Sequence, residues 1–458
     1  MSDKETTGPY LFRSFREQLL GPTIKHAVEN SHFYQSLFGD SWNQIRTIED
    51  LRHLPTTGKR IMRLSPIKEI LTSKEKPYLT QHTSGTTDQP FHVYRSRQEV
   101  EFIQAFFSER KNQDTSRNIA VFSLKPAYHG DPISIPVKGE FTNINILEED
   151  CIENLISKLK VSTSSFGDDR IGILSGIFHH VRYLTVHLMN SRFDFSQSGV
   201  KAIFITGQHV THRWRRLLEQ YWVNVPIVNR FSLTEGFGGA TQCNQCGLFH
   251  FDQYCIPEVL DLNTNIPLSQ GVGILHITSL FPFVQLMPFI RYRTNDLVRI
   301  VPCSCKACDG NAIELLGRWD HCGAVRRGKD TKVIIASTRL FEFLDEVNEV
   351  NTDNEFDNQT RIRDLTYAGN PKFRFSISET PPAVLQLLIE LRFPPQLYPD
   401  AIKPLKKRII EGVRKRNPGL QELEKNEPVT WNVDFLAPGT LKAFDPSSVP
   451  DSIIDEKN

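Results

Sequence analysis

A hydroxyl-rich run is the first feature of the sequence whose residue types suggest a specific chemistry. Four hydroxyl-bearing residues surround one glycine in Thr83-Ser84-Gly85-Thr86-Thr87, directly after an extended segment. Backbone N–H groups and hydroxyls that converge in one turn can bind phosphate oxygens. The run therefore indicates a phosphate-binding loop. The alternative is an ordinary turn rich in serine and threonine.

Two Cys-x-x-Cys pairs suggest a metal site. Their four cysteines are Cys243, Cys246, Cys305 and Cys308. A glycine follows each pair and lets backbone amides turn toward sulfur, and two such pairs make a tetrahedral thiolate site suited to Zn²⁺. Cys303 and His250 are substitute ligands if the four sulfurs do not converge. A four-sulfur site is closed, so the predicted role is structural. The alternative is free thiols on loops.

Further motifs follow one another in a fixed order over about residues 30 to 320. They are Ser31–Tyr34, Leu51–Lys59, Thr83–Pro90, Asn229–Glu235, Met287–Asp296 and Leu316–Asp320. In this order they resemble the adenylate-forming (AMP-forming) acid ligases, and within that superfamily the phenylacetate–CoA ligase branch. Near the carboxyl end, Pro438–Asp445 resembles the region that carries the family's mobile lysine.

The resemblance implies a reaction in two steps. ATP activates a carboxylic acid, here predicted to be an aryl or arylacetic acid, as an acyl-adenylate with release of pyrophosphate. The acyl group then passes to coenzyme A. The resemblance also implies that a small domain rotates about Asp320 between the two steps. One cleft needs such a switch, because one set of side chains cannot serve both chemistries.

The resemblance assigns roles to individual residues. Thr83, Ser84, Gly85, Thr86 and Thr87 would hold the β- and γ-phosphates, Thr234 the α-phosphate, and Glu235 would help to hold Mg²⁺, which prefers carboxylate oxygen. Asp296 and Arg318 would bind the ribose. Lys442 would bridge the attacking carboxylate and the α-phosphate, and an ordinary surface lysine is the alternative. The remaining residues expected at the nucleotide are Gly207, Phe231 and Ser232.

Several positions depart from the family pattern. Asp88 stands where the loop usually has glycine, and a carboxylate there would repel triphosphate. Phe231-Ser232 replaces Tyr-Gly, and Gly207-Gln208 stands where Gly-Glu is common. Three alternatives to the coenzyme A ligase therefore stay open. They are an enzyme whose acyl acceptor is an amine or a carrier protein, an enzyme that leaves AMP on a phenol, and a catalytically impaired binding homologue.

The expected acyl pocket lies between the strand end at 203–208 and the loop at 231–239. Gly236, Gly238 and Gly239 would leave room there for a ring, and Phe237 would line it. A basic run at residues 406–416 would meet the phosphates of coenzyme A or form a solvated helix face.

Alternating apolar runs predict the elements that position these residues. Residues 119–122, 171–174 and 202–205 are expected strands, with helices behind the second and third, which is typical of a parallel sheet covered by helices. Residues 274–277 and 289–292 are expected strands of a small barrel-like subdomain. Ser96 and Glu99 predict a capping box at the start of another helix. We expect an α/β amino-terminal adenylation domain, residues 1–319, and a smaller mobile α+β lid domain, residues 320–458.

Composition excludes several classes of protein. The 458 residues carry a net charge of +1, which argues against nucleic acid as the main partner. The sequence contains no run of 18 apolar residues, so no membrane span is expected, and the polar first residues do not resemble a secretory signal. Eight cysteines in two clusters and scattered singly favour a reducing, cytoplasmic setting. The sequence leaves open a monomer or a homodimer.

Overall fold

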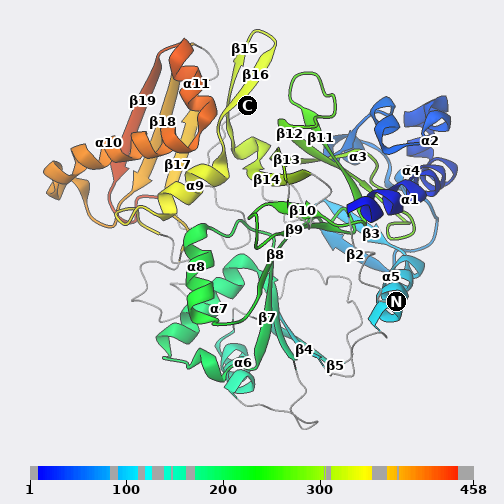
Figure 1. The fold of residues 1–458 in the computed structure, drawn as a ribbon, viewed down its shortest axis with the longest axis horizontal. Coiled ribbons are helices and arrows are strands. Elements are labelled where there is room, and N and C mark those ends of the chain that lie inside the picture. Colours follow the sequence, from blue (N-terminus) through cyan, green and yellow to red (C-terminus); the bar gives the residue numbers. More distant parts are fainter. Residues whose placement is uncertain are drawn as a thin grey trace.

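The fold comes from a computed structural model that describes residues 9–82, 91–111, 119–125, 139–145, 148–160, 171–303, 305, 311–352, 369–378 and 381–441. The helices of the amino-terminal part are α1 (Pro9–Asn30), α2 (His32–Phe38), α3 (Lys59–Leu64) and α4 (Ile67–Ile70), with 3-10 turns η1 (Gly39–Gln44) and η2 (Ile48–His53). The buried side of α1 carries Leu20 and Ile24, which belong to the same apolar cluster as Phe283 and Ile290. These helices lie beside strands β11 (Cys255–Asp261) and β12 (Gly271–Ser279) (Figure 1).

A run of parallel strands forms one half of the main sheet. Its order is β5 (Gly139–Asn145), β4 (Ile119–Lys125), β6 (Ile171–Ile177), β7 (Val200–Thr206) and β8 (Ile227–Ser232). The covering helices are α6 (Glu149–Lys160), α7 (Phe178–Asn190) and α8 (His212–Tyr221), which lie along one side of these strands in Figure 1. Their apolar residues form a shared core with the strands. The predicted parallel sheet with covering helices is therefore confirmed.

The other half of the same sheet is antiparallel. After β8 come β9 (Gly239–Gln242), β10 (Phe249–Phe251), β14 (Asn311–Arg318), β13 (Tyr292–Pro302), β12 and β11, and β1 (Thr57–Gly58) pairs with β13. In the described part of the chain, these strands continue the parallel half in one sheet of twelve strands, so the expected barrel-like subdomain is part of the same sheet. The strand expected at 289–292 begins only at Tyr292, since Arg291 has a positive φ of 47° that interrupts extended backbone.

Two elements flank the hydroxyl-rich run. Strands β2 (Leu79–His82) and β3 (His92–Arg95) form an antiparallel hairpin in which His82 pairs with His92, so residues 83–91 connect its strands. Helix α5 (Arg97–Lys111) follows. Ser96 caps α5 as predicted, because its Oγ accepts from the Glu99 N–H at 3.0 Å.

The carboxyl-terminal region has its own core. It contains β15 (Gly323–Arg327), β16 (Asp330–Ile335), α9 (Ser337–Asp345), β17 (Phe373–Ile377), β18 (Ala383–Glu390), η5 (Pro395–Leu397), α10 (Pro399–Arg416), α11 (Pro418–Asn426) and β19 (Val429–Leu436), after the turn η4 (Trp319–His321). Strands β17, β18 and β19 form a sheet whose apolar side chains pack on α9, α10 and α11. No helix in the described part of the chain is long and apolar enough to span a bilayer.

Candidate active site

Part of the predicted site lies outside the described residues. This part comprises Thr83, Ser84, Gly85, Thr86, Thr87, Asp88, Lys442 and Cys308. The hairpin that carries the hydroxyl-rich run is described, and it lies against the Thr234 segment: Arg95 at the end of β3 donates to the Thr234 carbonyl at 2.8 Å. The end of the hairpin that carries Arg95 and Leu79 therefore lies beside the Thr234–Gly236 loop.

Glu235 is a buried carboxylate held by two partners. Its Oε1 accepts from the Tyr292 hydroxyl at 2.8 Å and lies 3.5 Å from Lys59 Nζ. Burial raises the pKa of Tyr292 well above its ordinary value, and the nearby Glu235 charge adds to this, so Tyr292 keeps its proton and donates it. The sequence analysis assigned no role to Lys59 or Tyr292. Both residues lie inside motifs that resemble the family, and this was the signal in the sequence that could have identified them. Only the parallel pairing of Thr57 with Tyr292 brings them together.

Asp296 and Arg318 face each other across strands β13 and β14. They are register partners, and Arg318 Nη1 donates to Asp296 Oδ1 at 3.3 Å. Asp296 is 9% exposed. Burial raises its pKa, while Arg318 opposes that shift. Among the residues that the structure describes, neither Asp296 Oδ2 nor Arg318 Nε has a hydrogen-bond partner. A buried carboxylate oxygen without a donor is costly, so this position suits a ligand that supplies hydroxyl donors.

Glu235, Tyr292, Asp296 and Lys59 form one electrostatic group. The negative charge of Glu235 raises the pKa of Asp296, and the positive charge of Lys59 lowers it. Both act in addition to burial and Arg318. The structure therefore brings together Thr234, Glu235, Asp296 and Arg318, which the motifs selected separately.

The predicted hinge residue Asp320 lies in η4, next to this group. Asn295 Nδ2 donates a short hydrogen bond to Asp320 Oδ2, and Asn295 itself has a positive φ of 66°. The hinge role of Asp320 stays a prediction.

The carboxyl ends of β7 and β8 position the other expected nucleotide residues. Thr206 and Ser232 share a hydrogen bond of 2.8 Å between their hydroxyls. Gly207 has a φ of +81°, and a Cβ there would lie 3.0 Å from Ile177 Cγ2, so the turn after β7 needs glycine. Gln208 bonds His179 through both ends of its amide, at 3.1 Å to the backbone N–H and 2.9 Å to Nδ1. Phe231 pairs with Ala240 of β9.

The three glycines that were expected to leave room for a ring have close neighbours of their own, and the acyl pocket stays a prediction. A Cβ on Gly239 would lie 2.2 Å from the Phe231 carbonyl oxygen, and one on Gly238 would lie 2.7 Å from Asp252 Oδ1. Gly236 packs on Ile277. At all three glycines, the missing side chain lets other atoms of the chain approach closely. Phe237, which was expected to line that pocket, stacks on Phe283 with ring centroids 5.3 Å apart.

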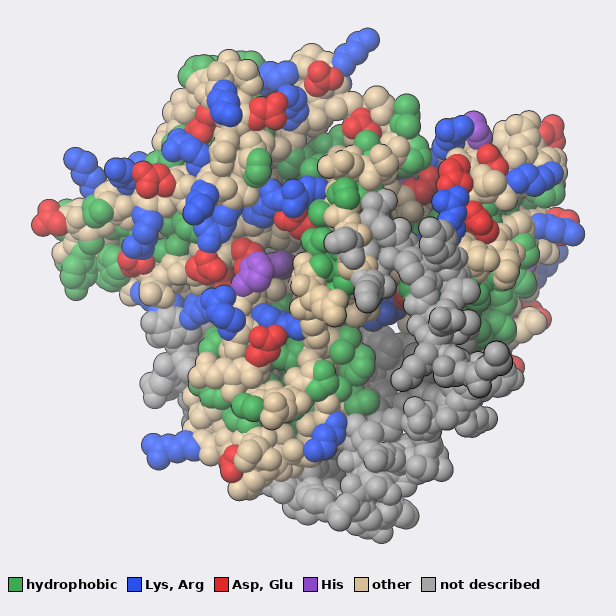
Figure 2. Space-filling model, in the orientation of Figure 1, with side chains coloured by type: hydrophobic (Ala, Val, Ile, Leu, Met, Phe, Trp, Pro, Cys, Tyr) green, Lys and Arg blue, Asp and Glu red, His purple; other side chains and the backbone are tan. Residues whose placement is uncertain are grey.

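The basic run of α10 is largely paired. Arg408, Arg414 and Arg416 form ion pairs with Glu349, Glu424 and Glu346, and Lys407 lies 3.9 Å from Glu411. Figure 2 shows basic and acidic side chains interspersed over the face of this region. The pairing favours the solvated-face interpretation over a phosphate-binding surface.

A cluster of thiols and one imidazole forms at the hairpin of β9 and β10. The ligand atoms of Cys243, Cys246, His250 and Cys305 all lie within 4.8 Å of one another. Cys246 Sγ is 3.0 Å from His250 Nε2, and Cys243 Sγ is 3.6 Å from Cys305 Sγ. Gly247, with φ of +72°, closes the turn, and the Gln245 N–H points at Cys243 Sγ from 3.3 Å.

The pKa values of this cluster shift in different directions. Backbone N–H donors lower the pKa of Cys243, whereas burial raises the pKa of Cys246 to about 12. Burial also lowers the pKa of His250, which favours the neutral imidazole that ligates metals. Three thiols and one imidazole are a donor set typical of Zn²⁺. His250, named only as a substitute, is therefore part of the described cluster.

Comparison with known proteins gives relatives in sequence and in fold. No protein-family model matches the chain. The chain is 23% identical to a phenylacetate–coenzyme A ligase of Pseudomonas putida over 65% of its own length and 69% of the ligase. It is 24% identical to the phenylacetate–coenzyme A ligase of Escherichia coli (strain K12), over 65% of its own length and 69% of that ligase.

Among solved structures, the chain is similar to 2-hydroxyisobutyryl-CoA ligase in the postadenylation state in complex with R3-HIB-AMP. The TM-score is 0.65 at 13% identity, over 100% of this chain and 94% of that one. The same ligase in its thioesterification state, with 2-HIB-AMP and CoA, matches with a TM-score of 0.53 at 14% identity, over 99% of this chain and 90% of that one. The resemblance to the phenylacetate–CoA ligase branch and the α/β fold with a smaller α+β region are therefore confirmed.

Proposed function

We propose that the chain is an AMP-forming ligase that activates a carboxylic acid with ATP and transfers the acyl group to coenzyme A. The observation that carries this proposal is the buried pair Asp296–Arg318, whose Asp296 Oδ2 has no donor among the described residues. Two neighbouring ribose hydroxyls would satisfy it. Glu235, in the same electrostatic group, would then lie near the phosphates.

The chain's own residues explain how such a site would bind and orient ATP. Arg318 holds Asp296 Oδ1 and leaves Oδ2 for the ribose. Tyr292 fixes Glu235, whose carboxylate is a donor that suits Mg²⁺. When bound, Mg²⁺ would neutralise charge on the phosphates. Lys59, beside Glu235, adds a cation that attracts the anionic substrates. Catalysis by such a site consists of positioning and charge stabilisation.

The proposal is completed by predicted site residues that lie outside the described part of the structure. The amides and hydroxyls of residues 83–87 would hold the β- and γ-phosphates, and Lys442 would approach the α-phosphate from the carboxyl-terminal region. The carboxylate oxygen attacks the α-phosphorus and pyrophosphate leaves. The thiol of coenzyme A then attacks the acyl carbon, and AMP leaves. The named relatives support an aryl or arylacetic acid as the substrate.

Pyrophosphate release with a panel of acids tests this function. We expect ATP- and Mg²⁺-dependent release with at least one aryl or arylacetic acid, and formation of its coenzyme A thioester. If hydroxylamine or an amine captures the acyl group while coenzyme A does not, the acceptor assignment is wrong. If no acid supports release of pyrophosphate, the ligase function itself is wrong.

We also propose that Cys243, Cys246, His250 and Cys305 hold one structural Zn²⁺. The proximity of their ligand atoms supports this assignment. Bound zinc would connect the hairpin after Glu235 to the segment that follows β13. A cytoplasmic location forms part of this proposal, because thiols that ligate a metal persist in a reducing compartment.

A further inference from the structure

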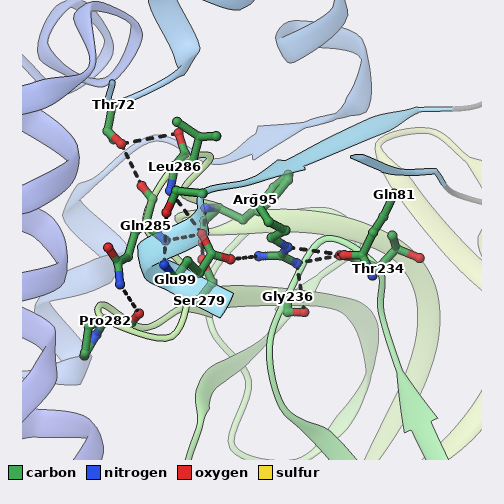
Figure 3. A network of polar contacts seen from close by, with 12 residues as sticks. Thr72, Gln81, Arg95, Glu99, Thr234, Gly236, Ser279, Pro282, Gln285 and Leu286 are labelled. Atoms are coloured by element: carbon green, nitrogen blue, oxygen red, sulfur yellow. Dashed lines mark hydrogen bonds and ion pairs between the residues drawn. The ribbon is translucent and has the colours of Figure 1, made fainter. Parts of the chain in front are cut away.

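The buried guanidinium of Arg95 donates hydrogen bonds to the backbone on both sides of Glu235. Arg95 is 1% exposed. Its Nη2 donates to the Thr234 carbonyl at 2.8 Å and to the Gly236 carbonyl at 3.3 Å. Figure 3 shows the guanidinium reaching from β3 to the loop that carries these carbonyls. The position of Glu235 therefore depends on Arg95, to which the sequence analysis assigned no role.

Arg95 is itself held from two further directions. Its Nη1 donates to Glu99 Oε1 at 2.9 Å, and its Nε donates to Gln81 Oε1 at 3.3 Å. Glu99 is fully buried, and its Oε2 accepts from the N–H groups of Gln285 and Leu286 at 2.9 and 3.2 Å. The capping-box pattern predicted that Glu99 reaches back to the helix start. Instead, its carboxylate supports Arg95.

The far end of this network is fixed to the amino-terminal region. The Thr72 hydroxyl donates to the Gln285 carbonyl at 2.8 Å, and the Thr72 N–H donates to the Leu286 carbonyl at 3.0 Å. Gln285 Nε2 donates to the Pro282 carbonyl at 2.9 Å (Figure 3). Glu99 therefore rests on a rigid support, and it can hold Arg95 in one position.

Arg95 also joins the β2–β3 hairpin to the loop that carries Glu235. Gln81 and Arg95 lie on the two strands of the hairpin that carries residues 83–87, and Arg95 binds the Thr234–Gly236 loop. A guanidinium has five donors in a rigid planar fork, so it can serve Gln81, Glu99 and two carbonyls at once. The ammonium of lysine is a point charge on a flexible chain and cannot span this set.

We propose that Arg95, supported by Glu99, is a positioning residue that fixes the Thr234–Gly236 loop, and with it the Glu235 carboxylate that would hold Mg²⁺. This inference rests on the proposed ligase function. The role differs from a purely structural one, because it predicts a change in the magnesium dependence of adenylation at constant stability.

Arg95→Lys tests the proposal, with Arg97→Lys as the matched control. Arg97 is exposed, two residues away, and lies over the Tyr78 ring at 4.7 Å. In Arg95→Lys we expect kcat for adenylate formation to fall about tenfold to a hundredfold, since displacement of a catalytic group by about 1 Å has an effect of that order. The Mg²⁺ concentration for half-maximal rate should rise, while KM for the acid stays unchanged. Arg97→Lys should behave as the wild type.

A second variant without charge at either position keeps the proposal testable if Arg95→Lys does not fold. In Arg95→Met with Glu99→Gln no buried charge is left unpaired, and the glutamine oxygen still accepts from Gln285 and Leu286. We expect a melting temperature close to that of the wild type, a loss of adenylation like that of Arg95→Lys, and faster hydrogen exchange in residues 233–238.

The outcomes separate this inference from the proposed function. If the wild type forms adenylate and both Arg95 variants match its rate, Mg²⁺ dependence and exchange, Arg95 has no positioning role and the inference alone is overturned. If the wild type forms no adenylate with any acid, the proposed function fails and the positioning role for that reaction fails with it.

Discussion

At the scale of single residues, Asp296 shows why the site needs a ligand. One of its oxygens is bonded to Arg318, and the other is buried without a donor among the described residues. We predict that Asp296→Asn raises KM for ATP by about tenfold to a hundredfold, because a hydrogen bond to a charged partner contributes about 1.5–3 kcal/mol. Steady-state kinetics at saturating acid measure it, with the exposed Asp330→Asn as the control. An unchanged KM in Asp296→Asn would exclude the ribose role.

The raised pKa of Asp296 gives this residue a second test. Burial raises the pKa, so Asp296 takes up a proton at a higher pH than an exposed aspartate does as the solution is acidified. Protonation removes the acceptor, and KM for ATP in the wild type should therefore increase toward acidic pH. The increase should be absent in Asp296→Asn, which has no group to titrate there. A parallel increase in both proteins would assign the effect to another group.

His276 provides a pH dependence of stability. It is 1% exposed on β12, and burial lowers its pKa to about 4 from the ordinary 6.5, with nearby arginines adding to the shift. The unfolded chain therefore takes up a proton below pH 6.5 that the folded chain refuses until about pH 4. The neutral ring contributes its stability above the unfolded pKa. As the pH falls toward about 4, up to about 3 kcal/mol is lost.

The measurement for His276 is urea unfolding near neutral pH and near pH 5. The wild type should lose more stability between the two conditions than His276→Asn, whose side chain does not titrate. The two curves would shift equally if other groups caused the acid sensitivity.

At the scale of elements, local patterns predict the parts of the chain whose structure depends on local chemistry. The strands near 119, 171 and 202 and the cap at Ser96 form as expected, because apolar runs and capping hydroxyls act over a few residues. The pairing of β10 with β14 was not predicted, because it joins distant segments and nothing in either strand specifies that partner. Likewise, Glu235 was selected by its motif, whereas Arg95 was not, since its role arises only from contacts with residues 139 and 141 positions away.

The β9–β10 hairpin and the segment after β13 should depend on metal. We predict about one zinc per chain by elemental analysis, and its loss in Cys243→Ser but not in Cys151→Ser, which alters a thiol on α6 outside the cluster. Chelation should lower the melting temperature and speed hydrogen exchange in residues 239–251 and near residue 305, because the cluster connects elements that are far apart in sequence. Zinc-free protein with unchanged exchange would show that the cluster has no structural metal.

At the scale of the whole molecule, helix α9 of the carboxyl-terminal region contacts the start of α8. Glu342 accepts from His209 Nε2 at 2.8 Å and from the His212 N–H at 3.1 Å, while Asp345 accepts from the Thr211 hydroxyl at 2.6 Å. Burial alone would raise the pKa of Glu342, but the His209 bond and the other donors lower it overall, so the carboxylate stays charged. The contact joins two separate cores, and rotation about Asp320 would break it.

Glu342→Gln should therefore affect the two half-reactions differently. Under the proposed function we assign the arrangement in the structure to the first half-reaction, so the contact should favour adenylate formation. We predict a decrease of about threefold to tenfold in the rate of pyrophosphate release, equivalent to about 1 kcal/mol. Thioester formation from preformed acyl-adenylate should be unchanged or faster. Glu346→Gln is the matched control, because Glu346 pairs with Arg416 inside the carboxyl-terminal region. Equal losses in both half-reactions would show that the contact supports the fold rather than one arrangement of the domains.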